Sequence, residues 1–326
     1  ASTGTIGGDF KPFDIILDGA LEAANRALNR ETRLTGVTTG LADLDRMLGG
    51  LQASDLLILA GRPSMGKTAL ATNIAFNAAK AAQRTGGREG AVVGFFSLEM
   101  SAEQLAVRIL SEEAEIPSED IRKGSLKRTD FPRLVEAAQT IRRVPLFVDD
   151  TAGLTIGQLR TRALRMKRRH DLGLVVVDYL QLMRPSGSHR TDNRVQEISE
   201  ITRGLKMVAK DLNLPVIALS QLSRAVEQRE DKRPQLADLR ESGSIEQDAD
   251  VVMFVFREEY YVSKREPTLD TPEHATWMQE MDRVHNLAEV IVGKQRHGPT
   301  GTVRLHFEGR FTRFSDYEGR FDGPDL

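Results

Sequence analysis

The chain has 326 residues, of which 40% are hydrophobic and 28% charged, and its net charge at pH 7 is -2. This near-neutral balance excludes a globally basic nucleic-acid-binding protein, so any such site must be a local patch. The absence of cysteine excludes disulfides, a thiolate nucleophile and cysteine zinc sites. The sequence shows neither a run of about 18 apolar residues nor a signal-peptide pattern, and we therefore expect a cytoplasmic protein.

The first periodic segment, residues 12–30, predicts an amphipathic helix. Its apolar residues recur every three or four positions and form one stripe, comprising Phe13, Ile16, Leu17, Ala20, Leu21, Ala24 and Leu28. The break TRLTGVTTG separates this helix from the rest of the chain. Two interpretations stay open, because the stripe could pack on its own domain or dock on a neighbouring subunit. Residues 1–11 are expected to be a flexible lead-in to a longer protein, and residues 31–326 to form the main domain.

Beyond residue 31, short apolar runs alternate with helical patterns. The runs are rich in β-branched and aromatic residues and lie at 55–60, 91–97, 145–149, 172–178, 214–220 and 250–256. Helical patterns lie between most of them, at 67–84, 101–115, 155–170 and 195–212. Near-continuous apolar strands separated by helices predict an α/β fold with a mostly parallel sheet covered on both faces. Residues 184–193 are expected to form a loop, and residues 264–287 a polar insertion of uncertain form.

A phosphate-binding loop is predicted at GRPSMGKT, residues 61–68, which matches G-x-x-x-x-G-K-[ST] in full. The motif follows a predicted strand and opens a predicted helix, which is the context it requires. Gly61 and Gly66 let the backbone N–H groups turn inward, and the helix N-terminus favours negative charge. Lys67 would reach the β- and γ-phosphates, and Thr68 could ligate magnesium.

Three polar residues follow other predicted strands. Asp178 ends LVVVD, where a magnesium-orienting acid is expected, although many strands end in Asp. Glu99 follows FFSL and could polarise an attacking water, but it could equally be an ordinary acid at a helix start, since Ser101 resembles an N-cap with Gln104 behind it. Gln221 could hydrogen-bond a γ-phosphate or remain a solvated loop residue.

Two basic segments are expected beyond the carboxyl ends of strands, where ligands of open α/β sheets bind. They carry Arg184, Arg190 and Arg194, and then Arg224, Arg229, Lys232 and Arg233. Such cations could track a phosphate backbone without reading sequence. Acids are interleaved with them, so solvated charged loops are the alternative. Near the C-terminus, VGKQRHGPTG predicts a β-hairpin on which Lys294 and Arg296 share a face.

Together these segments resemble the C-terminal ATPase domain of the DnaB-type bacterial replicative helicases. The resemblance rests on RPSMGKTALATNIA, FFSLEMS, VVVDYLQLM, VIALSQLSRAVEQR, DLRESGSIEQDADVVMF and VGKQRHGPTG, in order over residues 10–315. It implies a RecA-like core, a homo-hexameric ring with ATP and Mg²⁺ at subunit interfaces, and single-stranded DNA in the channel. It further implies a linker helix at residues 12–30, primase and helicase-loader partners, and an N-terminal domain that this sequence lacks.

Roles for individual residues follow from the same resemblance. The nucleotide would be held by Gly61, Ser64, Gly66, Lys67, Thr68, Ala69 and Asp178, with Thr68 and Asp178 on the metal. Glu99 would be the catalytic base and Gln221 the γ-phosphate sensor. Lys294 and Arg296 would act on the neighbouring subunit's nucleotide, with Arg296 as the arginine finger. DNA would be contacted by Arg194, Arg224, Arg240, Glu241 and Gly243, and by segments 184–197 and 222–233.

The hypothesis is thus an ATP-driven helicase that translocates on single-stranded DNA and unwinds duplex. A RecA- or RadA-like recombinase, which forms ATP-dependent filaments on DNA, is the alternative. A non-enzymatic ATP-binding scaffold is a third possibility, and the set of Lys67, Glu99 and Asp178 argues against it.

Overall fold

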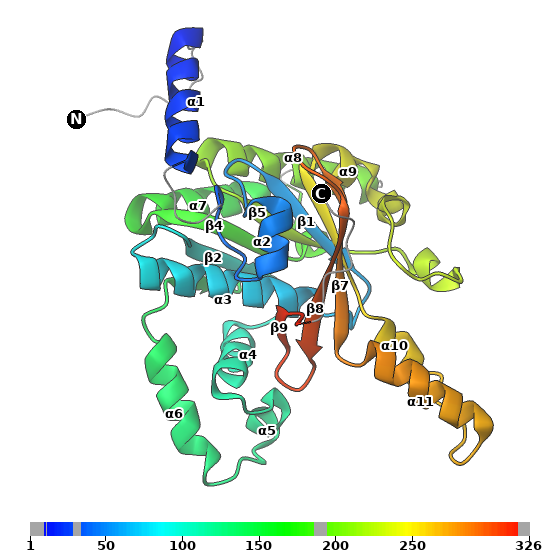
Figure 1. Cartoon of the computed structure of the whole chain (residues 1–326). Helices are drawn as coiled ribbons and strands as arrows, with labels where there is room; N and C mark the ends of the chain where they lie inside the picture. The colour runs from blue at the N-terminus through cyan, green and yellow to red at the C-terminus, as the bar shows by residue number, and fades with distance from the viewer. Residues whose placement is uncertain (1–9, 11, 29–33, 186–193, 319–326) are drawn as a thin grey trace.

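The computed structural model describes residues 10, 12–28, 34–185 and 194–318. Within this part of the chain, nine strands form one sheet in the order β3-β2-β4-β5-β1-β6-β7-β8-β9 (Figure 1). The strands are β1 (Leu56–Gly61), β2 (Val92–Ser97), β3 (Leu146–Asp149), β4 (Leu172–Asp178), β5 (Val216–Gln221), β6 (Val251–Phe256), β7 (Leu287–Gln295), β8 (Gly301–Glu308) and β9 (Arg313–Asp316).

The sheet divides into a parallel part and an antiparallel part. The first six strands of this order, β3, β2, β4, β5, β1 and β6, pair in parallel. Strands β7, β8 and β9 continue the sheet in antiparallel fashion. All residues of β1 and β6 are buried, which explains their continuous apolar sequences. The predicted α/β fold class with a C-terminal antiparallel extension is confirmed, and the extension has a third strand, β9, that was not predicted.

The helices are named in chain order, with three short 3₁₀ segments between them. The α-helices are α1 (Phe13–Leu28), α2 (Ala42–Leu48), α3 (Lys67–Thr85), α4 (Ala102–Ala114), α5 (Ser118–Lys123), α6 (Asp130–Ile141), α7 (Ile156–His170), α8 (Arg194–Leu212), α9 (Gly243–Asp248), α10 (Glu258–Ser263) and α11 (Pro272–Val284). The 3₁₀ segments are η1 (Leu180–Leu182), η2 (Arg224–Gln228) and η3 (Leu236–Ser242).

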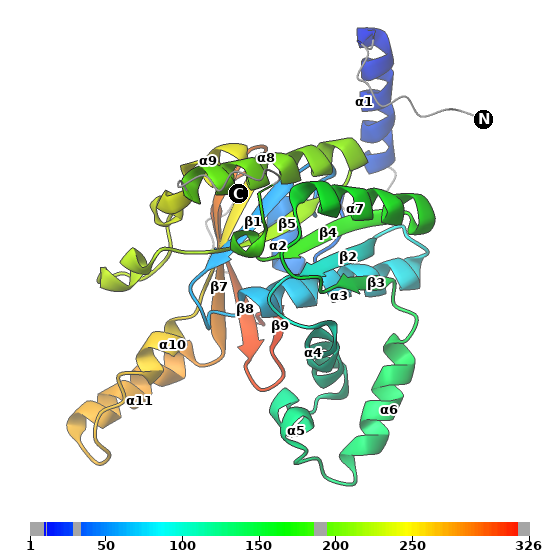
Figure 2. The same cartoon turned by 180° about the vertical axis from the view of Figure 1, so that it is seen from behind.

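Each face of the sheet has its own apolar core, because alternate residues of a strand point to opposite faces. Leu57 and Leu59 of β1 pack in a cluster with residues of α2, α3 and β7 to β9. Leu56 and Ile58 pack in the other cluster, with residues of α7 and α8. Figures 1 and 2 show α7 and α8 over one face and α3 over the other, with α4, α5 and α6 beyond α3. The sheet is therefore covered on both sides, as expected.

Several helices lie where no element was predicted. The segment between α4 and β3 contains α5 and α6, and α2 precedes β1. The polar insertion at 264–287 forms most of an arm in which α11 follows α10 and extends away from the sheet (Figure 2). The expected N-cap of the 101–115 helix is confirmed, since Ser101 and Gln104 form a capping box at the start of α4.

Helix α1 stands apart from the sheet in Figures 1 and 2. Its apolar residues Phe13, Ile16, Leu17 and Leu21 are 46–74% exposed, and none belongs to an apolar cluster of the described chain. Of the two interpretations of this stripe, packing on its own domain is therefore not what the structure shows. Residues 1–9, 11 and 29–33, and the side chains of Ala24 and Leu28, lie outside the described residues.

Candidate functional site

The predicted phosphate-binding loop connects β1 to α3. Gly66 immediately precedes α3 and has φ of 96°, and Ser64 has φ of 68°. A side chain at Gly66 would be strained at this φ and would place its Cβ 3.0 Å from the Phe314 ring. The backbone therefore curls at this point as the motif requires, and the first turn of α3 faces the loop.

This loop borders a cavity of about 350 Å³ at the carboxyl ends of β1, β2 and β5. The predicted residues Glu99 and Gln221 line the cavity together with the loop. The full lining comprises Arg62, Pro63, Ser64, Gly66, Lys67, Thr68, Ala69, Glu99, Arg108, Tyr179, Gln221, Phe307 and Thr312. The fold thus brings together residues that are separated by more than 150 positions in the sequence.

Asp178 lies at the end of β4, next to this cavity, and is only 1% exposed. Within the described part of the chain, neither carboxylate oxygen has a hydrogen-bond partner of good geometry. Burial raises the pKa of Asp178 to about 6; the nearby Glu99 charge adds to the shift, while Thr68 and Lys67 oppose it. A buried carboxylate without a partner is costly unless a ligand satisfies it. The donor set of Asp178 and the Thr68 hydroxyl suits a hard divalent cation that retains waters.

Two cationic side chains, Lys67 and Arg108, lie near the carboxylates of Asp178 and Glu99. Burial lowers the pKa of Lys67 below its ordinary value, while the charges of Asp178 and Glu99 oppose the shift. Arg108 of α4 also lines the cavity and interacts electrostatically with both acids. Arg108 was missed in the sequence, although a signal existed: it lies three residues after the buried Leu105 and therefore on the inner side of α4.

Gln221 lies at the exposed end of β5 and is connected to the segment after β4. Its backbone N–H donates to Gln181 Oε1 at 3.4 Å, and Gln181 Nε2 donates to the Ser220 hydroxyl at 3.0 Å. The side-chain amide of Gln181, which lies just after β4, is therefore hydrogen-bonded to β5, the strand that ends in Gln221. This contact aligns the ends of two neighbouring strands at the cavity.

Lys294 and Arg296 lie at the opposite end of the sheet from this cavity. Lys294 Nζ donates to the carbonyl oxygens of Glu246 and Ala249 at 2.5 and 2.8 Å. Arg296 is half exposed and pairs with Asp250, 3.4 Å away, beside the start of β1. Because the phosphate loop follows the end of β1, the length of that strand, roughly 20 Å, separates Arg296 from the loop of its own chain.

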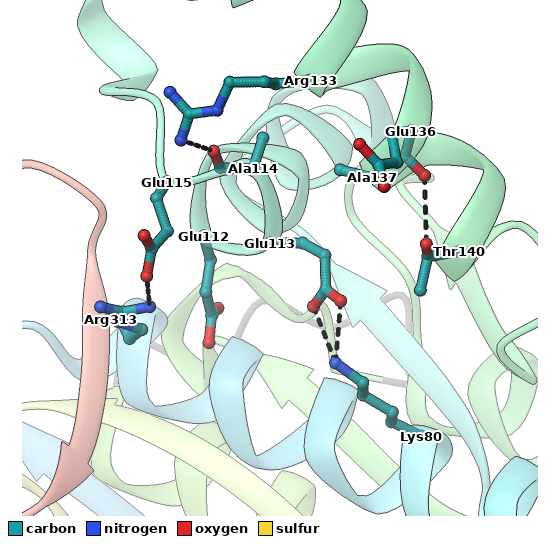
Figure 3. A pocket seen from close by; sticks show the side chains of 10 residues that line it. All are labelled: Lys80, Glu112, Glu113, Ala114, Glu115, Arg133, Glu136, Ala137, Thr140 and Arg313. Carbon is teal, nitrogen blue, oxygen red and sulfur yellow. Dashed lines mark hydrogen bonds and ion pairs between the residues drawn. The ribbon is translucent and has the colours of Figure 1, made fainter.

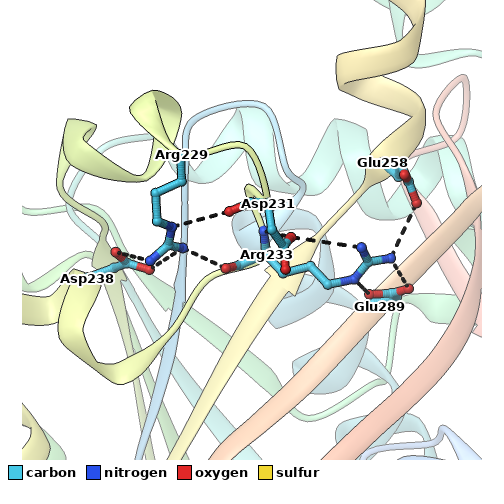
Figure 4. Close-up of polar contacts among 6 residues, drawn as sticks. All are labelled: Arg229, Asp231, Arg233, Asp238, Glu258 and Glu289. Carbon is cyan, nitrogen blue, oxygen red and sulfur yellow. Dashed lines mark hydrogen bonds and ion pairs between the residues drawn. The ribbon is translucent and has the colours of Figure 1, made fainter.

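The predicted DNA-contacting residues fall into three groups. Arg194 and Arg224 are exposed, although Arg194 also pairs with Glu197 at 2.6 Å. Residues 186–193, with Arg190, lie outside the described residues, as do the side chains of Arg240 and Glu241 and the surroundings of Gly243. In segment 222–233, Arg229 and Arg233 are engaged in ion pairs within the protein (Figure 4).

A second cavity, of about 510 Å³, lies between α3, α4, α6 and β9 (Figure 3). Ion pairs line it, joining Lys80 to Glu113 and Arg313 to Glu115. Glu112 accepts a hydrogen bond from Asn73 Nδ2 at 2.6 Å, and burial raises its pKa to about 7. Most charged groups that line this second cavity are paired with one another, which indicates that they join the surrounding elements rather than bind a ligand.

No helix in the described ranges is long and apolar enough to cross a membrane. The same ranges contain no cluster of three or more His, Cys, Asp or Glu side chains suited to a metal ion. A cation beside Asp178 would therefore depend on the Thr68 hydroxyl, water and the bound ligand itself.

Comparison with known proteins gives a consistent picture. Residues 36–316 match the family model for the DnaB-like helicase C terminal domain. The chain is 51% identical, over 98% of its length, to the replicative DNA helicase DnaB of Rickettsia conorii, and 44% identical, again over 98%, to that of Geobacillus stearothermophilus. It spans 65% of the length of each of these helicases.

Two solved structures are also similar to the chain. The ATPase domain of G40P superposes with a TM-score of 0.81 at 34% identity, covering 95% of this chain and 100% of that one. A DnaB-like replicative helicase, described with its interactions with primase, gives a TM-score of 0.77 at 34% identity and covers 95% of this chain and 68% of that one.

Proposed function

Because the chain belongs to the DnaB-like helicase C-terminal domain family, we propose that it is the ATP-hydrolysing motor of a replicative DNA helicase. The observation that carries this proposal is the cavity at the strand ends, which Lys67, Glu99 and Gln221 line beside the buried Asp178. The family match favours the helicase over the recombinase.

In this proposal the chain's residues divide the work at the cavity. Lys67 and the loop N–H groups bind the phosphates of ATP, and Thr68 and Asp178 hold Mg²⁺. Magnesium, when bound, neutralises phosphate charge as the γ-phosphate is transferred to water. Glu99 accepts a proton from that water, and Gln221 orients the same water molecule by a hydrogen bond. Arg108 contributes a further positive charge beside the transferred group.

We further propose that the chain functions as a homo-hexamer. Arg296 and Lys294 lie at the opposite end of β1 from their own phosphate loop, so an effect on hydrolysis requires the cavity of another copy. The Lys294 contacts to Glu246 and Ala249 hold this strand end in place. The exposed apolar face of α1 supports assembly as well, since it is suited to docking on an adjacent subunit.

Single-stranded DNA is the proposed track. Arg194 and Arg224 are exposed near the cavity side of the sheet and would contact its phosphates, and the proposal extends to Arg240, Glu241 and Gly243. By family membership, primase and a helicase loader are the proposed protein partners, and the cytoplasm is the proposed location.

The proposal is tested by ATP hydrolysis and strand separation with wild-type protein and Glu99→Gln. Wild type should hydrolyse ATP faster with single-stranded DNA and unwind a forked duplex. Glu99→Gln should still bind ATP but lose turnover by about 10²–10⁴-fold, because the proton acceptor is removed. Turnover close to wild type in the variant would remove Glu99 from this role, and DNA-independent hydrolysis without unwinding would overturn the helicase assignment.

A further inference from the structure

Glu227 of η2 makes an ion pair with the phosphate-binding loop. The Arg62 Nε donates to Glu227 Oε1 at 3.0 Å, and the Arg62 Nη1 donates to the Leu222 carbonyl at 2.9 Å. The Arg62 side chain is 12% exposed and the Glu227 side chain 36% exposed, so the guanidinium is sheltered while the carboxylate remains partly open to solvent. Arg62 also lines the nucleotide cavity. One guanidinium therefore faces both the cavity and the segment that follows Gln221.

The same carboxylate is held from a second side. The Tyr261 hydroxyl of α10 donates to Glu227 Oε1 at 3.3 Å. Burial raises the pKa of Tyr261 to about 12, and the Glu227 charge adds to the shift, so the phenol remains a neutral donor. Tyr261 in turn stacks on Phe256 at the end of β6, with ring centroids 5.9 Å apart. Two donors on separate elements therefore fix the orientation of Glu227.

The rest of this segment is stiffened by ion pairs that do not reach the loop. Arg229 contacts both oxygens of Asp238 at 3.1 and 3.0 Å, which joins η2 to η3 (Figure 4). Arg233 pairs with Glu289 of β7 at 2.9 Å and with Glu258 at 3.3 Å. Segment 222–239 is thus held by several ion pairs, with the exposed Arg224 near its start and η3 continuing past its end to Ser242.

We propose that Glu227 is a positioning residue that couples the nucleotide cavity to segment 222–239, and through it to DNA engagement. A guanidinium shared between a cavity and a carboxylate responds to the charge in that cavity, because charged hydrogen bonds compete for the same donors. A loss of phosphate charge on hydrolysis strengthens the hold of Arg62 on Glu227, and a bound polyphosphate weakens it. This inference rests on the proposed function, since it assigns a route by which DNA and ATP affect each other.

The test measures kcat and KM for ATP, with and without a single-stranded oligonucleotide, in wild type, Glu227→Gln and Glu227→Asp. In Glu227→Gln, the ratio of DNA-stimulated to basal kcat should fall about fivefold, while basal kcat stays near wild type. The KM for ATP should fall, because a neutral amide competes less strongly than a carboxylate for Arg62. Glu227→Asp, which keeps the charge, should recover part of the ratio. A merely structural role would lower the thermal midpoint and both rates together, without recovery in the Asp variant.

Glu258→Gln is the matched control, because it removes a carboxylate of α10 that contacts the same segment through Arg233, while Arg233 keeps Glu289. Its ratio should equal that of wild type. If Glu227→Gln does not fold, Tyr261→Phe decides instead: a smaller loss of the ratio supports the coupling, and an unchanged ratio overturns it. An unchanged ratio in Glu227→Gln with a DNA-stimulated wild type overturns the coupling alone, whereas a wild type that DNA does not stimulate overturns the proposed function too.

Discussion

Two buried aspartates at opposite ends of the sheet differ in how they are satisfied. Asp250, 2% exposed, accepts from the Leu56 N–H at 2.8 Å, pairs with Lys206, and lies 3.4 Å from Arg296. Asp178, 1% exposed, has no hydrogen-bond partner of good geometry among the described residues. Proteins satisfy buried charges wherever stability alone decides. The comparison therefore separates a carboxylate that is satisfied within the fold from one for which we propose a ligand.

The largest expected effect tests the Asp250 end of the sheet. Arg296→Ala should lower ATP turnover by about 10³-fold or more, because the arginine finger proposed at this position would supply charge in the transition state. Mixing Arg296→Ala with Lys67→Ala subunits should restore part of the activity, since some interfaces then contain two intact halves. Turnover is measured across mixing ratios. An absence of recovery at every ratio, with mixed assembly confirmed by native mass spectrometry, would count against a role in trans.

Removal of the Asp250 charge should act on stability. Asp250→Asn leaves Lys206 and Arg296 without their partner, and breaking a buried ion pair costs about 3 kcal/mol or more. Urea unfolding measures the loss. Asp211→Asn, which breaks the exposed Arg160–Asp211 pair, is the control and should cost less than about 1 kcal/mol. Equal losses in the two variants would show that burial does not distinguish these pairs.

Removal of the Asp178 charge should lower ATP turnover without lowering stability, in contrast to removal of the Asp250 charge. Asp178→Asn should reduce ATP turnover by about a hundredfold, because the carboxylate proposed to hold Mg²⁺ is lost. Its free energy of unfolding should stay the same or increase, since a buried charge without a hydrogen-bond partner is removed. Turnover and urea unfolding are measured on the same preparation. A clear loss of stability would mean that Asp178 is a structural residue like Asp250.

Glu112 is an intermediate case and should give the smallest effect. Its hydrogen-bond donor is the neutral Asn73 amide, and burial raises its pKa from 4.5 to about 7. Because the folded state binds this proton more tightly, the contribution is fully present below pH 4.5 and is lost as pH rises through 7. Glu112→Gln should therefore stabilise the protein at pH 8 by about 2 kcal/mol, with little change at pH 4.5.

Unfolding at several pH values measures the Glu112 effect. Glu136→Gln, which removes an exposed carboxylate from the same cavity, is the control. A Glu112→Gln variant that is less stable than wild type at pH 8 would contradict the sign of this prediction.

The parallel sheet and the cavity were predictable because their signals are local. Each buried strand is a continuous apolar run, and the phosphate loop has a fixed spacing. Helix α5 was not predictable in this way, because it has six residues and buries none of them. The four-residue β9 became a strand through pairing with β8 and contact between Phe314 and Phe307. Such long-range contacts leave no periodic pattern in the sequence.

In the candidate site too, residues with a local sequence signal were predictable, whereas contacts between distant side chains were not. Glu99 and Gln221 follow strands, so their convergence on the cavity follows from a parallel sheet. Arg62 and Tyr179 lie within motifs that were recognised, yet their contribution to the cavity lining depends on side-chain direction. The engagement of Arg229 and Arg233 by Asp238 and Glu289 depends on partners up to 56 positions away. Charge counts in a segment cannot distinguish such cations from those free to bind a ligand.

The exposed apolar face of α1 has a consequence for how this helix folds. A 16-residue helix is marginal in water on its own, and packing of Phe13, Ile16, Leu17 and Leu21 is what would stabilise it. In the proposed docking of α1 on a second copy, its helical content would be linked to the concentration of the protein by mass action. In dilute solution the segment should sample the unfolded state, whereas occupation of its apolar face by a second molecule should order it.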